Sequence, residues 1–511
     1  MTGGISLTLE TVKTDFVNHL KKISAYQEAL GLIFWDLRTG APKKAIEQRS
    51  EVIGTLSSEV FNLSTSDQMA EYINELNHHK SELDELTVKM LEECEKEFNR
   101  NRKIPEDEFK KYVVLKSKSE SVWEEARENS DFALFEPYLK ELVDTTRRFV
   151  EYWGYEDNPY NTLLDMYEPG VTVEVLDEVF GRVREAIVPL VKGIEASPVK
   201  PETSFIYKRF PKSAQREFSL HVLKELGYDF DAGRLDETVH PFATGLNTGD
   251  VRITTRYDEL DFRGAIFGTI HECGHALYEQ NIDPALTGTP LSGGTSMGIH
   301  ESQSLFMENF VGRHPEFWRC HLPALKEYSP EQFNDVTVEE FLSGINESKP
   351  SLIRVDADEL TYALHIMIRY EIEKGLFNGV YEVHELPKVW NQKYEEYLGV
   401  TPTDDAEGIL QDVHWSGGAF GYFPSYALGY MYAAQFKHAM QKDLPQFDKY
   451  IKNGEIAPIK NWMTEKVHRF GKTKKPLEIL EEATGEGLNA DYLIKYLQDK
   501  YAELYDLELA K

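Results

Sequence analysis

The first part of the chain shows the spacing of apolar residues that is typical of helices. From residue 8 to about 195, apolar positions recur at intervals of three and four, and alternating runs rich in valine or isoleucine are few. Residues that break helices interrupt this pattern at Gly40-Ala-Pro42, at Pro105, near Asn158-Pro159 and at Pro169-Gly170. The opening helix is predicted to bury one side through Leu9, Val12, Phe16, Leu20 and Ile23.

The segment Glu195–Thr203 contains two prolines and is the clearest linker in the chain. It either separates an N-terminal helical layer (1–195) from a catalytic part (205–511) or crosses a cleft within one body. The pattern of residues alone leaves both possibilities open.

A small amount of β-structure is predicted near the middle of the chain. Asp250–Tyr257 is the best strand candidate, because apolar and polar side chains alternate along it. A second short β-like segment is predicted around Thr289–Met297. After Glu301 the helical pattern returns and is interrupted at Pro350, Pro402, Pro424, Pro458 and Pro476. The predicted fold class is therefore mostly α, with a small sheet next to a helix at 267–279.

That helix carries the sequence His271-Glu-Cys-Gly-His275. Residues four apart lie on one face of a helix, so the imidazoles of His271 and His275 can reach a single metal ion. Glu272 lies roughly 100° around the helix, where its carboxylate can hold the water that such a metal activates and accept its proton. Two histidines on a surface helix are the alternative. The flanking apolar residues favour a buried helix and hence a metal site: Ile266, Phe267, Ile270 and Leu277.

A catalytic zinc takes three protein ligands and leaves one position for water. Tyr278 and Asn281 occupy the places where the three-histidine class carries its next glycine and histidine, which excludes that class. Glu301 is predicted to begin the next amphipathic helix and to be the third ligand. The alternative is a first-turn glutamate that the helix dipole favours. Glu308, two turns on, is predicted to accept a hydrogen bond from a histidine N–H.

Composition and charge limit the partners. The net charge of −31 would repel nucleic acid and anionic membranes, so neither is expected to bind. The three cysteines (Cys94, Cys273 and Cys320) are too few for a disulfide framework, which favours a reducing cytoplasm. No signal peptide is recognisable at the N-terminus. The uncharged run Trp415–Phe436 has the length of a membrane span, but its glycines, proline and tyrosines favour a buried wall or a cavity-lining loop.

Two further clusters are unusually polar. Arg354 stands beside Asp356 and Asp358, just before a long predicted helix. His414 lies shortly before a glycine-flanked turn that contains Tyr422. Histidine and tyrosine are neutral donors suited to an oxyanion, although spacing alone equally allows both to be satisfied core residues.

Six motifs, in this order, closely resemble the carboxypeptidase Taq family of metallocarboxypeptidases. They are His240-Pro-Phe242, Asp250-Val-Arg-Ile-Thr254, His271-Glu-Cys-Gly-His275, His300-Glu-Ser-Gln-Ser304, Ile353-Arg-Val-Asp-Ala-Asp358 and Gly408-Ile-Leu-Gln-Asp-Val-His-Trp415. The resemblance runs from Phe34-Trp-Asp36 to Lys500-Tyr-Ala-Glu-Leu-Tyr505. Cys273 stands where a larger apolar residue is usual, and we expect little consequence.

The resemblance implies one mostly helical body over residues 1–511 with a long substrate groove, related to the oligopeptidase-like zinc enzymes and usually a homodimer. It implies removal of single residues from peptides with a free C-terminal carboxylate, with zinc or cobalt as the metal and with proline excepted. By motif match, three residues bind the metal (His271, His275 and Glu301), and Glu272 is the general base.

The resemblance also suggests substrate contacts. Arg252 would close the bottom of the groove and Arg354 would face the substrate carboxylate. The other candidate substrate-binding residues are His240, Gln411 and Tyr426. The turn at Tyr422 resembles the tyrosine-containing turn of the angiotensin-converting type of dipeptidase, with His414 in a similar place upstream, which makes these two the candidate oxyanion donors.

An arginine suits the recognition of a terminal carboxylate, because its planar guanidinium binds a carboxylate through two parallel hydrogen bonds. Arg354 is the first candidate, with Asp356 and Asp358 expected to orient it, and Arg252 is the second. A plain structural Arg–Asp pair is the alternative.

Two other functions remain possible. A zinc oligoendopeptidase of related fold would need no carboxylate anchor and would cut peptides blocked at the C-terminus. A non-catalytic helical scaffold would hold zinc through four protein ligands and leave no exchangeable water.

Overall fold

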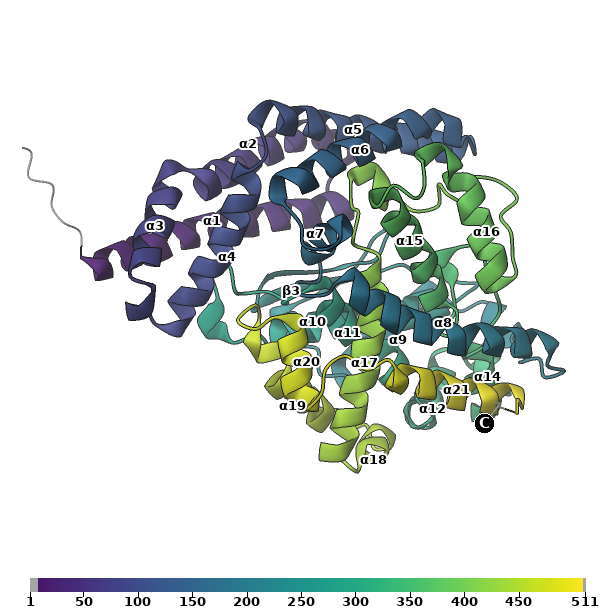
Figure 1. The fold of residues 1–511 in the computed structure, drawn as a ribbon. Coiled ribbons are helices and arrows are strands. Elements are labelled where there is room, and N and C mark those ends of the chain that lie inside the picture. The colour runs from purple at the N-terminus through teal and green to yellow at the C-terminus, as the bar shows by residue number, and fades with distance from the viewer. Residues whose placement is uncertain (1–7, 509–511) are drawn as a thin grey trace, which may run out of the picture.

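The computed structural model describes residues 8–508, and it confirms the predicted mostly α fold with one small sheet. The early helices form a layer along one side of the molecule (Figure 1). Three of the breaks between them fall at predicted glycines and prolines (residues 40–45, 103–105 and 154–158), and three were not predicted (residues 66, 79–84 and 129–131). These helices are α1 (Leu9–Thr39), α2 (Ile46–Thr65), α3 (Asp67–His78), α4 (Glu85–Arg102), α5 (Glu106–Glu128), α6 (Phe132–Trp153) and α7 (Pro159–Asp165).

Local chemistry explains where these helices start. The Thr8 side chain accepts a hydrogen bond from the backbone N–H of Thr11, and Asn158 caps α7 in the same way with a proline at the first helical position. On α1, four of the five predicted apolar positions are buried (Val12, Phe16, Leu20 and Ile23). The prediction of an amphipathic opening helix is therefore confirmed.

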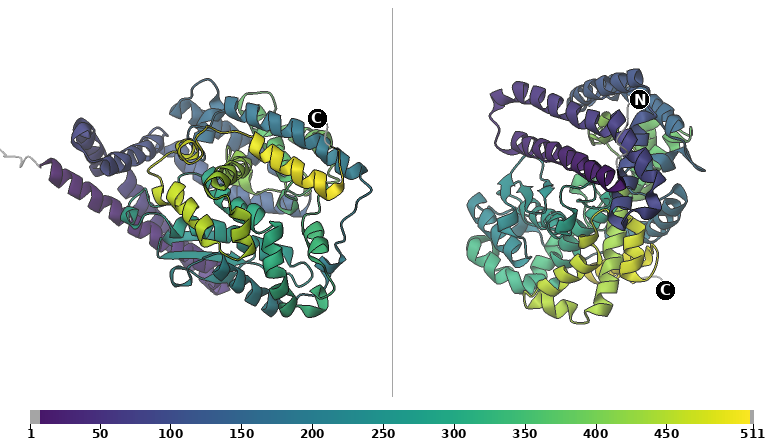
Figure 2. Two further views of the ribbon diagram at one scale, coloured as in Figure 1. Left: turned by 90° about the horizontal axis from the view of Figure 1, so that it is seen from below. Right: turned by 90° about the vertical axis from the view of Figure 1, so that its left-hand side faces the viewer.

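Helix α8 (Val173–Ala196) leaves this layer and packs against the C-terminal helix α21 (Asp491–Tyr505). The two run side by side in the left view of Figure 2 and across the lower part of Figure 1. The chain then passes through the predicted linker, which is largely irregular, into α9 (Lys212–Glu225).

The sheet has three strands in the order β1-β3-β2: β1 (Leu235–Glu237), β2 (Ala243–Asn247) and β3 (Asp250–Thr255). The predicted strand is the central one. It pairs in parallel with β1, with Leu235 opposite Ile253, and antiparallel with β2, with Ala243 opposite Ile253. The flanking strands were not predicted. The predicted strand around Thr289–Met297 is wrong, because local turn hydrogen bonds occupy the backbone there, as between Ser292 N–H and Thr289 C=O.

Three helices cross at the centre: α10 (Arg263–Gln280), which packs on β3, α11 (Met297–Leu305) and α17 (Pro424–Asp443). Glycines allow them to approach closely. A Cβ atom at Gly274 would lie 2.3 Å from the Gln303 carbonyl oxygen, and one at Gly429 would lie 2.7 Å from the Cβ of Glu301. The metal motifs on α10 and α11 are therefore held against each other by backbone contact.

The uncharged run Trp415–Phe436 forms a short turn followed by most of α17, and from Pro424 to Phe436 every residue except Tyr426 is buried. This agrees with the predicted buried wall. Within residues 8–508, none of the helices combines the length and the apolar character that a membrane crossing requires.

The remaining helices surround this centre. They are α12 (Pro315–Tyr328), α13 (Pro330–Phe333), α14 (Val338–Ile345), α15 (Tyr362–Phe377), α16 (Leu386–Leu398), α18 (Phe447–Lys452), α19 (Ala457–Lys466) and α20 (Pro476–Thr484). Between α11 and α12 the chain winds through a π-helical segment, Phe306–Val311.

Candidate metal centre

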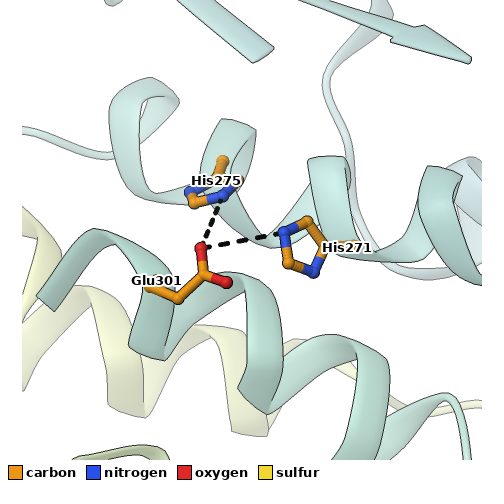
Figure 3. A group of neighbouring side chains, drawn as sticks. All are labelled: His271, His275 and Glu301. Carbon is orange, nitrogen blue, oxygen red and sulfur yellow. Dashed lines mark ion pairs between the residues drawn. The ribbon is translucent and has the colours of Figure 1, made fainter. Parts of the chain in front are cut away.

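The three predicted metal ligands meet where α10 and α11 cross. The Oε2 atom of Glu301 lies 3.8 Å from Nε2 of His271 and 3.3 Å from Nε2 of His275. The ligand atoms of all three residues lie within 4.8 Å of one another, and Figure 3 shows them turned toward one point. Two imidazole nitrogens and one carboxylate oxygen are the donor set of a catalytic zinc site.

Glu301 does not begin its helix, so that part of the prediction is wrong. Helix α11 starts at Met297 and is capped by Ser296, which places Glu301 in the second turn. The helix dipole acts mainly on the first turn, so it does not explain a buried glutamate at this position.

The second ring nitrogen of each histidine is held by another side chain. Nδ1 of His271 lies 2.9 Å from Oε2 of Glu308, which is the contact predicted for that glutamate. Nδ1 of His275 lies 2.7 Å from Nδ1 of His300, whose Nε2 lies 2.6 Å from Oε1 of Glu279. Such contacts fix the ring tautomer, because an Nδ1–H that donates outward leaves the Nε2 lone pair directed at the metal. The residues present therefore fit a metal ion.

The Glu308 contact leads to a testable prediction. Removing a hydrogen-bond acceptor behind a metal-binding histidine lowers metal affinity by roughly 10–100-fold. We expect that loss for Glu308→Ala and a smaller one for Glu308→Gln, which keeps an oxygen acceptor. Titration of metal against a competing chelator measures the change. An unchanged dissociation constant for Glu308→Ala would show that the contact does not support the site.

The electrostatics of the site also favour a cation. Burial opposes the charged form of Glu301, but His271 and His275 outweigh it and lower its pKa to about 2. Burial raises the pKa of Glu272, which is 9% exposed, to about 7. Together with Glu308, these carboxylates surround two imidazoles, and a divalent ion would neutralise their charge.

The three candidate ligands line a cavity of about 770 Å³. Glu272 lines this cavity, as do three other predicted site residues: Arg354, Tyr422 and Tyr426. The remaining lining includes residues that sequence reasoning missed, among them Tyr362, Tyr430 and Arg313. Aromatic residues at helical spacing, such as Tyr362 and Tyr430, are typical of the protein core. Nothing in the sequence distinguishes these residues or Arg313 as part of a cavity lining.

Arg354 is held by a residue distant in sequence. Its Nε and Nη2 atoms lie 2.9 and 2.8 Å from Oδ1 of Asp412, and its side chain is 9% exposed. The expected orientation by Asp356 and Asp358 is wrong. Asp356 is exposed, and Asp358 accepts hydrogen bonds from the backbone of Leu360 and Thr361.

Arg354, Arg369 and Asp412 form an arginine cluster, which carries two positive charges and one negative charge. Arg369, which is fully buried, also binds Asp412, with Nε 2.6 Å from Oδ2. Two guanidinium groups thus share one carboxylate. Among residues 8–508, the Nη1 atom of Arg354 has only the Tyr362 hydroxyl as a hydrogen-bond partner, at 3.4 Å, and therefore keeps capacity for a further anion.

The other predicted substrate residues lie outside the cavity lining. The Gln411 side-chain oxygen accepts hydrogen bonds from the backbone N–H of Arg354 and from Arg369, so it supports the cluster from behind. Arg252 pairs with Asp250 and stacks on the ring of Trp35. His240 is exposed, next to the cavity-lining residues Pro241 and Phe242.

The two candidate oxyanion donors differ in position. Tyr422 lines the cavity, whereas His414 lies behind Tyr426, with Nε2 3.2 Å from the Tyr426 hydroxyl. Burial lowers the pKa of His414 to about 4, so its imidazole is neutral near pH 7. The geometry therefore presents Tyr422 and Tyr426 to a ligand directly and His414 only through Tyr426.

Comparisons with known proteins identify the family. The family model for the carboxypeptidase Taq (M32) metallopeptidases matches residues 15–501. Carboxypeptidase 1 of Bacillus subtilis is 61% identical over 98% of this chain and 100% of its own length. Thermostable carboxypeptidase 1 of Thermus thermophilus is 40% identical over 94% of this chain and 97% of its own. The M32 carboxypeptidase of Deinococcus radiodurans superposes with a TM-score of 0.94 at 36% identity, over 97% of this chain and 100% of that one.

The chain is therefore a member of the carboxypeptidase Taq (M32) family of metallopeptidases, and so a hydrolase.

Proposed function

We propose that this metallopeptidase is a zinc-dependent carboxypeptidase that releases single residues from peptide C-termini, with Glu272 as the general base. One observation supports this most directly. The same cavity is lined by the His271, His275 and Glu301 cluster, by buried Glu272 and by Arg354, whose cluster carries excess positive charge. A metal, a base and a carboxylate anchor are the parts that such a reaction needs.

A zinc ion held by His271, His275 and Glu301 would supply Lewis acidity toward water and toward the scissile carbonyl. Glu272 follows His271 on α10 and lines the cavity without belonging to the ligand cluster. Its carboxylate accepts the proton of the attacking water and then passes it to the amine that leaves.

Arg354 binds the terminal carboxylate of the peptide through the Nη1 edge that faces Tyr362. Asp412 and the ring of Tyr426, 5.1 Å from the guanidinium carbon, hold the guanidinium in place. A carboxylate fixed there sets which peptide bond reaches the metal, and this restricts cleavage to the last residue.

Tyr422 donates a hydrogen bond to the oxygen that becomes negative during the attack. Removing one such donor costs about 10²–10³ in kcat. We expect Tyr422→Phe to lose about 10², at the lower end of that range, because the Tyr426 hydroxyl lines the same cavity. Steady-state kinetics on a tripeptide measure it. An unchanged kcat would transfer the role to Tyr426 or to His414 behind it.

The identity of the metal is tested by reconstitution. The metal-free protein should regain activity with zinc and with cobalt, because both accept two nitrogens and one oxygen with an open position. It should regain little with magnesium, which prefers six oxygen ligands. Full activity with magnesium alone would contradict a zinc site.

We also propose that the protein acts in the cytoplasm as a homodimer on free peptides. The three cysteines are free, and one of them, Cys273, is buried in α10, which suits a reducing compartment. The dimer rests on the resemblance alone, and light scattering of the purified protein tests it. A monomer at micromolar concentration would contradict it.

A further inference from the structure

A fully buried glutamate lies behind the turn that carries His414 and Tyr422. Glu373 belongs to α15, and none of its surface is exposed. Its Oε1 atom accepts a hydrogen bond from Nε1 of Trp415 at 2.8 Å. Its Oε2 atom accepts one from the backbone N–H of Gly421 at 2.9 Å, and another from the hydroxyl of Tyr160. Glu373 does not line the cavity.

The partners of Glu373 adjoin the two candidate oxyanion donors in the sequence. Trp415 directly follows His414, and Gly421 directly precedes Tyr422. The two oxygens of one carboxylate thus hold both ends of the turn between His414 and Tyr422. At one end the carboxylate holds the indole of Trp415, and at the other it holds the backbone of Gly421.

The turn is also confined from the side of α7. Gly421 has a φ of +93°, and a Cβ atom there would lie 2.7 Å from the carbonyl group of Leu163. The Tyr422 ring packs edge-on against the ring of Tyr167, with 5.1 Å between centroids. Tyr160, the third donor to Glu373, lies at the start of the same short helix. The carboxylate therefore ties the turn to α15 and to α7 together.

Stability alone does not account for a carboxylate at this place. Burial raises the pKa of Glu373 to about 7 although three donors oppose the rise. Well-packed apolar residues often stabilise a protein as much as buried charged groups do. A carboxylate differs from an apolar side chain because it accepts hydrogen bonds in defined directions, and here it fixes an indole N–H and a backbone N–H in one geometry.

We propose that Glu373 is a positioning residue for the reaction, which holds the turn between His414 and Tyr422 so that the Tyr422 hydroxyl faces the scissile carbonyl. This inference rests on the proposed function, in which Tyr422 is the oxyanion donor. Glu373 touches no substrate and acts only through the turn.

Kinetics of two substitutions test the inference. Glu373→Met removes both acceptors and should lower kcat by about 10–10², since small displacements of a catalytic group have effects of that order. KM and the zinc content per chain should stay close to those of the wild type. Glu373→Gln keeps one acceptor oxygen and should recover part of the loss, and it also serves if the methionine variant folds poorly.

Glu371→Met is the matched control. Glu371 lies two residues away on α15, and its carboxylate binds Arg184, Lys393 and Tyr397, none of which lines the cavity. Its loss should lower Tm without changing kcat. If Glu373→Met behaves in the same way, with a lower Tm and the kcat of the wild type, its role is structural and the inference is wrong.

A double substitution separates this inference from the proposed function. If Glu373 acts through Tyr422, then Glu373→Met should change kcat by less than about twofold in a Tyr422→Phe background, because coupled residues are not additive. Equal losses in both backgrounds would overturn the inference and leave the role of Tyr422 intact. An unchanged kcat in Tyr422→Phe alone would overturn the donor assignment, and the inference with it.

Discussion

The Glu272→Gln variant is expected to keep its metal and to lose its turnover, with kcat lower by about 10²–10⁴. The amide has nearly the same shape as the carboxylate but does not accept a proton at neutral pH. Because Glu272 does not belong to the ligand cluster of His271, His275 and Glu301, its replacement leaves the metal donors in place.

Metal analysis and kinetics on the same preparation decide this prediction. Glu301→Gln is the matched control, since it makes the same chemical change at a ligand and should lower metal content together with activity. If Glu272→Gln retained more than a few per cent of the wild-type kcat, Glu272 would not be the base.

The Arg354→Ala variant should lose about 10²–10³ in kcat/KM on peptides with a free C-terminus. An unpaired desolvated carboxylate costs about 3–5 kcal/mol, which corresponds to a loss of that order or more. Peptides that end in an amide carry no such charge, so the wild type should cut them poorly and the substitution should matter much less for them.

The structure limits other effects of this substitution. Asp412 keeps Arg369 as a partner when Arg354 is removed, so no buried carboxylate is left alone. Arg184→Ala is the control, because Arg184 pairs with Glu371 outside the cavity lining, and its loss should leave kcat/KM close to that of the wild type. Equal losses of Arg354→Ala on free and amidated peptides would indicate a damaged site rather than a lost anchor.

The helices and the central strand were predictable because they depend on local sequence. Proline and glycine mark the ends of α1, α4 and α6, and alternation marks β3. Strands β1 and β2 were missed because three and five residues are too short for a pattern. The segment Thr289–Met297 was misread because its threonines favour strands, whereas its glycines and serines favour the turns that form there.

The pairing of His271 and His275 in one cluster was predictable for the same reason, because their spacing is a property of one helix. The partner of Arg354 was not, since Asp412 lies far along the chain and reaches Arg354 only through tertiary packing. The sequence instead suggested Asp356 and Asp358, which are close in sequence but face elsewhere. The sequence did not predict the role of Glu373 either, because a glutamate in a helix is usually a surface residue, and only the structure shows that Glu373 is buried.

In the proposed function, one cavity combines a metal, a base and an anchor for a free carboxylate. Mass spectrometry of one peptide, prepared with a free and with an amidated C-terminus, tests it most directly. We predict a ladder of products that lose single residues from the free C-terminus, that disappears with chelator and returns with zinc, and that is nearly absent for the amidated peptide. Internal fragments, or equal cleavage of both peptides, would contradict the claim.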